Sequence, residues 1–235
     1  MKRRLQNLAL ALISMCALLP PVGFSCSAFA ESLPRPSASS DPALLRRWVA
    51  VVDKKIEKNG PEAEYYCSKG QLLEWLHEPY AAIQQYSLAI KQNPNDLSFF
   101  IGRARSYRAA KKWKEALSDY NTAISRGKVS SESYIGRSLA ELALHNYSSA
   151  YSDATKAIEI DSSESIAWLA KGNAELELGK LKESVVSLSK AIELEPRDAA
   201  FYEIRSAAYA KLGDRKNAKR DMALYEQYSK SVTGE

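Results

Sequence analysis

Residues 165–198 read SIAWLAKGNAELELGKLKESVVSLSKAIELEPRD. Two apolar runs at helical spacing fill this stretch, one before Gly179 and one after it. Gly179 can take the left-handed conformation that ends a helix, and Pro196 follows the second run, where proline cannot continue a helix. The stretch therefore predicts two helices joined by a short turn.

The same pattern occurs five times at a step of 34 residues, without a gap. An aromatic ring marks each copy: Tyr66, Phe100, Tyr134, Trp168 and Tyr202. A small residue follows four positions later: Gly70, Ala104, Ser138, Gly172 and Ser206. Another comes after twelve more: Ala82, Ala116, Ala150, Ser184 and Ala218. A fixed period of this length is typical of stacked helix pairs, each too small to bury its own apolar face. We therefore expect an all-α fold.

These columns resemble the tetratricopeptide repeat, whose pattern places an aromatic residue, a glycine and alanines at such positions. The resemblance divides residues 63–232 into five tandem repeats: 63–96, 97–130, 131–164, 165–198 and 199–232. It implies a right-handed superhelical solenoid of antiparallel helix pairs. One column departs from the family pattern, because a cation replaces the large apolar residue before the glycine: Lys69, Arg103, Arg137, Lys171 and Arg205.

Aspartates follow three of these cations at a distance of sixteen residues, on the expected second helix of each pair: Asp119 after Arg103, Asp153 after Arg137 and Asp221 after Arg205. The two repeats with lysine have no aspartate there. We predict a bidentate ion pair that clamps the two helices together. The alternative is a basic stripe for an anionic ligand, although the chain already supplies the anion.

The first thirty residues are of a different kind. Three cations at residues 2–4 precede an apolar run at 8–19, and Ala28-Phe29-Ala30 offers a small-x-small cleavage site. Residues 1–30 are therefore predicted to be a secretory signal peptide, which predicts export, to a bacterial periplasm or the medium. Lipid attachment at Cys26 is the weaker alternative, because the residues before it fit a lipoprotein signal poorly. The run is too short for a comfortable membrane span of about 20 residues, so we expect no stable membrane insertion after cleavage.

Residues 31–40 are rich in proline and serine and are predicted to form a disordered linker. Residues 41–60 lack the repeat columns but have helical spacing, which predicts a capping helix over the first repeat. Loss of residues 1–30 removes three of the 33 Lys and Arg and none of the 28 Asp and Glu, leaving 30 against 28, a net charge of +2. This balance gives no argument for a nucleic-acid partner.

No set of convergent polar groups indicates catalysis. The two histidines, His77 and His145, fall in the same column at the expected turn between helices, which indicates a turn role rather than metal binding. Glycine-rich phosphate loops, paired-cysteine zinc spacing and nucleophile elbows are absent from the sequence. We therefore expect no enzyme activity, no cofactor, and no catalytic or metal-binding residue.

In the resembled family, first helices line a concave groove that receives an extended peptide or a partner helix. The resemblance places nine residues of this sequence in such a groove: Ile101, Arg105, Arg108, Ile135, Leu139, Leu142, Leu169, Asn173 and Leu176. An apolar lining with arginines on one side suits a peptide with hydrophobic anchors and an acidic end. The alternative is that individual leucines pack between neighbouring repeats.

The sequence thus predicts an exported, non-catalytic adaptor that binds other proteins in its groove. The alternative is a structural subunit of an envelope complex that self-associates through its last helix. Met222, Tyr225 and Tyr228 have no following helix to cover them, and they would form that homodimer surface.

Overall fold

The computed structural model describes residues 41–233, and side chains up to Lys230. The predicted signal peptide, the linker and Cys26 lie outside the described residues. Residues 41–233 form eleven helices and no strand, which confirms the all-α prediction. The helices pack into two compact units, one up to Lys128 and one from Val129, which are described separately.

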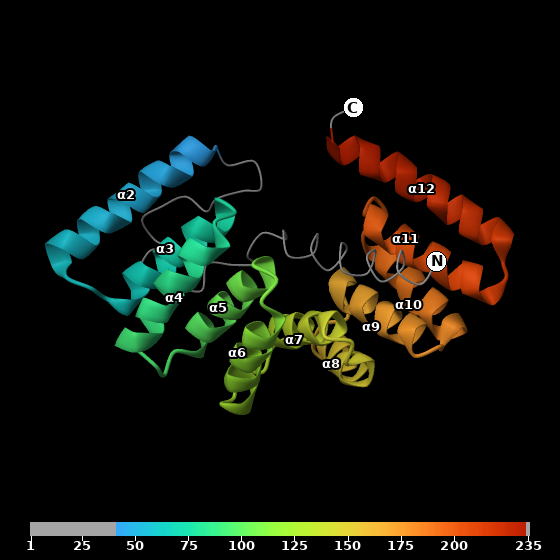
Figure 1. Cartoon of the computed structure of the whole chain (residues 1–235), viewed down its shortest axis with the longest axis horizontal. Coiled ribbons are helices and arrows are strands. Elements are labelled where there is room, and N and C mark those ends of the chain that lie inside the picture. The colour runs from blue at the N-terminus through green and yellow to red at the C-terminus, as the bar shows by residue number, and fades with distance from the viewer. Residues whose placement is uncertain (1–40, 234–235) are drawn as a thin grey trace. The chain divides into compact units, whose positions relative to one another are not determined.

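In the first unit, α2 (Pro42–Asn59) is followed by two antiparallel pairs. Their bounds are α3 (Ala63–Trp75) with α4 (Pro79–Gln92), and α5 (Leu97–Ala109) with α6 (Trp113–Ser125). The second unit contains three pairs: α7 (Ser131–Ala143) with α8 (Tyr147–Ile160), α9 (Ser165–Glu177) with α10 (Leu181–Leu194), and α11 (Ala199–Leu212) with α12 (Arg215–Thr233). Within each unit a second helix also packs on the first helix of the next pair, as Figure 1 shows for α4 with α5 and for α10 with α11.

The turn inside each pair depends on one residue with a left-handed backbone. Glycine occupies this position in two pairs, with φ of 78° at Gly179 and 83° at Gly213. The other three pairs use His77, Lys111 and His145, with φ of 55°, 58° and 63°. A side chain is costly in this conformation, so these three turns carry local strain.

Small residues permit the two helices of a pair to approach closely. Ala82, Ala116 and Ala150 have no exposed surface. Where the small residue is a serine, it also joins the helices: Ser138 Oγ donates to the Ala150 carbonyl at 2.8 Å, and Ser184 Oγ donates to the Gly172 carbonyl at 2.7 Å. The helices are therefore close at these crossings, and the buried serine hydroxyls have hydrogen-bond partners.

Helix α2 packs on α3 through a core of its own. Leu45, Trp48 and Val52 are buried against Leu72 of α3. Asp41 caps the start of the helix, accepting from the backbone N–H of Ala43 at 2.9 Å. This helix covers one face of the first pair.

Candidate functional site

The predicted groove residues lie at matching positions on three first helices. Within the second unit, α7 and α9 pack directly beside each other, and each contributes three of these residues at a spacing that puts them on one helix face. The structure therefore brings one set of six together: Ile135, Leu139, Leu142, Leu169, Asn173 and Leu176. The remaining three, Ile101, Arg105 and Arg108, lie on α5 of the first unit.

Eight of these nine side chains are buried, and only Arg105 is half-buried. Leu139 is 2% exposed and Asn173 is 5% exposed. Little of their surface is available to a partner in this structure, so binding in the groove stays a prediction.

Arg105 is held by a carboxylate that the sequence did not single out. Glu74, on α3, accepts from Arg105 Nη2 at 2.7 Å and from Arg105 Nε at 3.3 Å. The same carboxylate accepts from Ser106 Oγ and from the hydroxyl of Tyr86, both at 3.0 Å. This network joins α3, α4 and α5, and burial together with the charge of Glu74 raises the pKa of Tyr86 well above its usual value.

A ligand carboxylate at Arg105 would therefore compete with Glu74. The Arg105 side chain is 18% exposed and that of Glu74 is 9% exposed, so the pair is shielded from solvent. Single-sequence reasoning missed Glu74, because in the other repeats its column holds Arg108, Leu142, Leu176 and Ala210.

The three arginine–aspartate pairs have the bidentate geometry of a clamp. Arg103 Nε and Nη2 donate to Asp119 at 2.7 and 2.9 Å. The same two atoms of Arg137 donate to Asp153 at 2.6 and 2.7 Å, and those of Arg205 donate to Asp221 at 2.7 and 2.9 Å. The aspartates are almost fully buried, with 2–8% of each side chain exposed. Hydrogen bonds to the aspartates raise the pKa of Arg103 and Arg137.

Arg103 and Arg205 also reach the preceding pair. Arg103 Nη1 donates to Ser87 Oγ of α4 at 3.2 Å, and Arg205 Nη1 donates to Ser189 Oγ of α10 at 3.0 Å. Each guanidinium therefore holds three helices. This supports a structural role for the cation column rather than a ligand-binding stripe.

The lysine repeats use other partners. Lys69 Nζ contacts Asp53 of α2 at 2.5 Å, and Lys171 Nζ lies 3.9 Å from Glu175 on its own helix. Glu175 in turn accepts from Ser187 Oγ at 2.7 Å, and its burial raises the pKa of its carboxyl. Without an aspartate sixteen residues ahead, these lysines thus pair elsewhere.

The histidines lie at exposed turns. His145 Nδ1 is 2.8 Å from the hydroxyl of Tyr147, and His77 has the same left-handed backbone. Within residues 41–233, no group of three or more His, Cys, Asp or Glu side chains is arranged to hold a metal ion. Over the same residues, no helix combines the length and apolar character needed to cross a membrane.

The last helix exposes less aromatic surface than expected. Met222 is 40% exposed, but Tyr225 and Tyr228 are only partly exposed. The ring centroid of Tyr228 lies 5.4 Å from that of Tyr202 on α11, so this part of α12 packs against the first helix of its own pair. Most other exposed side chains of α12 are charged.

These paired helices define an all-α solenoid of the tetratricopeptide-repeat type. A family model described as a TPR repeat matches residues 172–213, which run from α9 to α11, so the chain contains such a repeat. A search of curated proteins found no match.

Solved structures share the fold at low sequence identity. The TPR protein YrrB, described as having an unusual peptide-binding site, is 19% identical, with a TM-score of 0.61 over 77% of this chain and 93% of that chain. MamA from Desulfovibrio magneticus is 14% identical, with a TM-score of 0.64 over 72% and 96%. A chain of the Cut9–Hcn1 complex is 16% identical, with a TM-score of 0.71 over 94% and 42%. At this identity the likeness shows the fold alone.

Proposed function

We propose that this chain is an exported, non-catalytic adaptor of five tetratricopeptide repeats that binds peptide segments or helices of other proteins on the inner face of its first helices. The repeat match at 172–213 and the TPR-like fold support a role as a protein-interaction scaffold. The peptide-binding site described for YrrB gives a precedent for a ligand on this fold.

One observation carries the proposal: first helices contact each other across successive pairs. α3 meets α5 in the first unit, and α9 meets both α7 and α11 in the second. Second helices contact only first helices in the main packing of residues 41–233. First helices therefore line the tighter side of each unit and present residues from several repeats to one ligand.

The chemistry of this face differs between the units. In the second unit it is aliphatic with one amide, Asn173, whereas in the first unit the Arg105–Glu74 pair lies in it. Aliphatic anchors would bind in the second unit, and a polar segment would bind beside Arg105 and Arg108 in the first.

Photo-crosslinking tests the face directly. A photoreactive amino acid would replace Asn173 in one variant and Val186, which is 68% exposed on the second helix α10, in a control variant. We expect an envelope extract to yield a crosslinked protein from position 173 and none of that protein from position 186. The same product from both positions, or products from 186 alone, would contradict groove binding. N-terminal sequencing of the mature protein would test export separately, with Glu31 expected first.

The alternative function, self-association in an envelope complex, depends on the exposed Met222. Met222→Asp should abolish any concentration-dependent rise in mass if α12 forms a homodimer. If that rise persists in the variant, the C-terminal surface is not responsible.

A further inference from the structure

Helix α2 has the register of a second helix, one repeat before α4. Asp53 of α2 precedes Lys69 by the same sixteen residues that separate Ser87 from Arg103 and Ser189 from Arg205. Each of these earlier residues contacts its later cation, with Lys69 reaching Asp53, Arg103 reaching Ser87 and Arg205 reaching Ser189. α2 is thus related to α3 as α4 is to α5.

A neighbouring position supports the same register. Val52 lies 34 residues before Tyr86, and both are fully buried, with exposures of 0% and 1%. Both side chains face the first helix that follows, since Val52 packs with Leu72 of α3 and Tyr86 lies against Gly102 of α5. The 34-residue repeat therefore extends one helix before Ala63.

The partner of α2 within this repeat is missing from the main packing of residues 41–233. α4 packs on its own first helix α3 and on α5, whereas among the helices of residues 41–233 the main contact of α2 is with α3. Val51 lies 68 residues before Asp119, at the position that elsewhere clamps the first helix of the same pair, and it is 41% exposed. Leu44, two helical turns earlier on this face, is 37% exposed.

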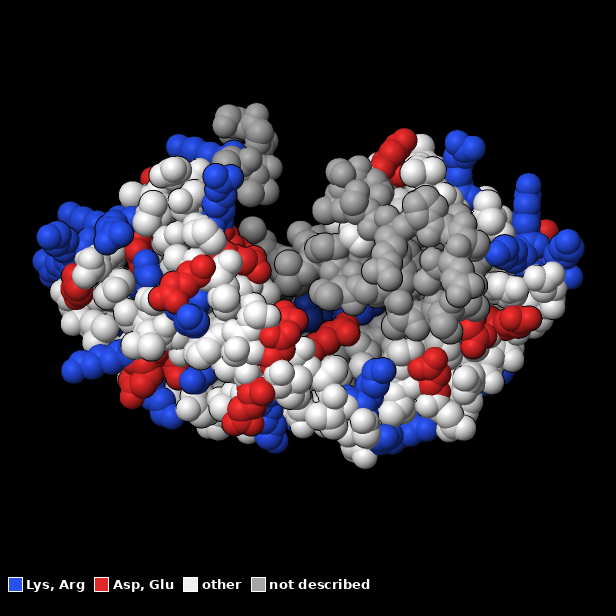
Figure 2. All heavy atoms as spheres, turned by 180° about the vertical axis from the view of Figure 1, so that it is seen from behind, with Lys and Arg blue, Asp and Glu red and all other residues white. Residues whose placement is uncertain are grey.

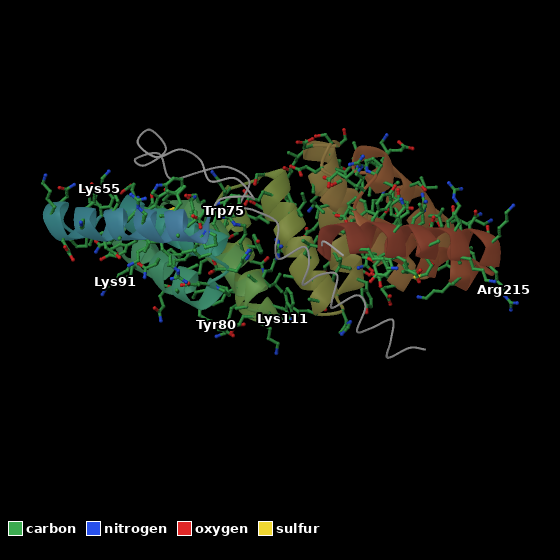
Figure 3. All side chains as sticks on the ribbon, turned by 90° about the horizontal axis from the view of Figure 1, so that it is seen from above. Lys55, Trp75, Tyr80, Lys91, Lys111 and Arg215 are labelled. Atoms are coloured by element: carbon green, nitrogen blue, oxygen red, sulfur yellow. The ribbon has the colours of Figure 1, made fainter. Side chains whose placement is uncertain are left out.

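Basic side chains flank these two aliphatic residues. Arg47, Lys54 and Lys58 are exposed, and a helical wheel places them on the same stripe as Leu44 and Val51. α2 holds five cations and two acids, a net charge of +3. Figure 2 shows blue side chains over α2 at the right edge of the view, and Figure 3 labels Lys55 on the same helix.

We propose that the open face of α2, defined by Leu44, Arg47, Val51, Lys54 and Lys58, binds an acidic amphipathic helix of a partner protein. That helix lies antiparallel to α2, in the place that the first helix of a pair holds against its second helix in the complete repeats. Its aliphatic residues contact Leu44 and Val51, and its carboxylates face the basic stripe.

Charge argues against a second copy of this chain as the occupant. The exposed face at the other end of the repeats belongs to α12, which also holds five cations and two acids, a net charge of +3. Stacking α12 of one copy on α2 of another would bring two basic helices together.

A peptide taken from the chain itself tests the proposal. Residues 131–144, SESYIGRSLAELAL, are the first helix of a complete pair and its C-cap residue Leu144, and they present Arg137 to an aspartate. On α2 the facing residue is Val51, so Arg137→Leu in this peptide converts the contact to an aliphatic one and raises the net negative charge from −1 to −2. The measurement is fluorescence anisotropy of the labelled peptides titrated with the full chain.

We expect the leucine peptide to bind at least about tenfold more tightly than the arginine peptide, with an affinity that falls as salt rises. Val51→Asp in the protein should reverse this preference, because it restores the aspartate that the arginine peptide requires. Lysine in place of both glutamates should abolish binding of the leucine peptide.

Three outcomes would overturn the proposal. One is no binding of the leucine peptide to the parent chain. Another is binding that Val51→Asp leaves unchanged. The last is a parent chain that self-associates in sedimentation and becomes monomeric on Val51→Asp, which would assign the face to a second copy. Circular dichroism of Val51→Asp checks that the exposed substitution leaves the fold intact, and none of these results depends on groove binding by α7 and α9.

Discussion

The ring of Tyr86 lies so close to the backbone of Gly102 that a β-carbon on the glycine would be 2.5 Å from Tyr86 Cε1. The opposite edge of the ring faces Gly70, where a β-carbon would be 3.0 Å away. The ring is fully buried, with Gly70 of α3 and Gly102 of α5 on its two sides. Two glycines thus make space for one tyrosine of α4.

Gly102→Ala should therefore destabilise the protein by about 1–3 kcal/mol through overpacking, despite the better helix propensity of alanine. Urea unfolding measures the change. Tyr86→Leu in the same chain provides the control, since a smaller side chain should remove most of the cost of adding the methyl group. A Gly102→Ala variant as stable as the parent would show that the ring can shift.

Arg137→Ala should lower the free energy of unfolding by about 2 kcal/mol, because it leaves the buried Asp153 without its bidentate partner. Arg137→Lys keeps the charge but loses one of the two hydrogen bonds, and an intermediate stability is expected. The double variant Arg137→Leu with Asp153→Leu should recover much of the loss. Unchanged thermal stability in Arg137→Ala would contradict the clamp.

Lys111→Gly should stabilise the protein by up to about 1 kcal/mol, because φ at this exposed position is 58° and glycine adopts it without strain. Figure 3 labels Lys111 at this turn. The matched control is Gly179→Ala, which places a side chain at a φ of 78° and should destabilise by a similar amount. Differential scanning calorimetry would reveal the opposite shifts in Tm. If Tm moved in the same direction in both variants, backbone strain at the turn would not explain the changes.

The free energy of unfolding should decrease as pH rises from about 4.5 to about 7, because of the buried carboxyl of Glu203. Burial raises the pKa of this carboxyl from 4.5 to about 7, so between these values the folded chain binds a proton that the unfolded chain has released. Its contribution is favourable below pH 4.5 and is lost as pH rises through about 7. Glu203→Gln should be more stable than the parent at pH 8, by on the order of 1–2 kcal/mol, and similar to it at pH 4. Equal stability at pH 8 would mean that the carboxyl ionises at its ordinary value.

The all-α architecture could be predicted from the 34-residue columns, because the same small residues must recur wherever two helices cross. The ion-pair geometry also follows a column: sixteen residues carry the chain from Arg103, round the turn at Lys111, to Asp119 on the facing helix. Patterns that repeat in sequence thus report contacts that repeat in space.

The features that could not be predicted are those that occur once. Glu74 meets Arg105 across 31 residues, and its column is not acidic in the other repeats. The register of α2 was hidden because the small residue of the repeat is replaced by Trp48 and the clamp aspartate by Val51. Burial of the predicted groove residues depends on packing between helices, which the apolar pattern of one helix does not reveal.

The guanidinium of Arg103 holds Asp119 on α6 and Ser87 on α4 at the same time, so one side chain on α5 links the two pairs of the first unit. Amide protons of α4, α5 and α6 should consequently exchange with deuterium as one cooperative block rather than hairpin by hairpin.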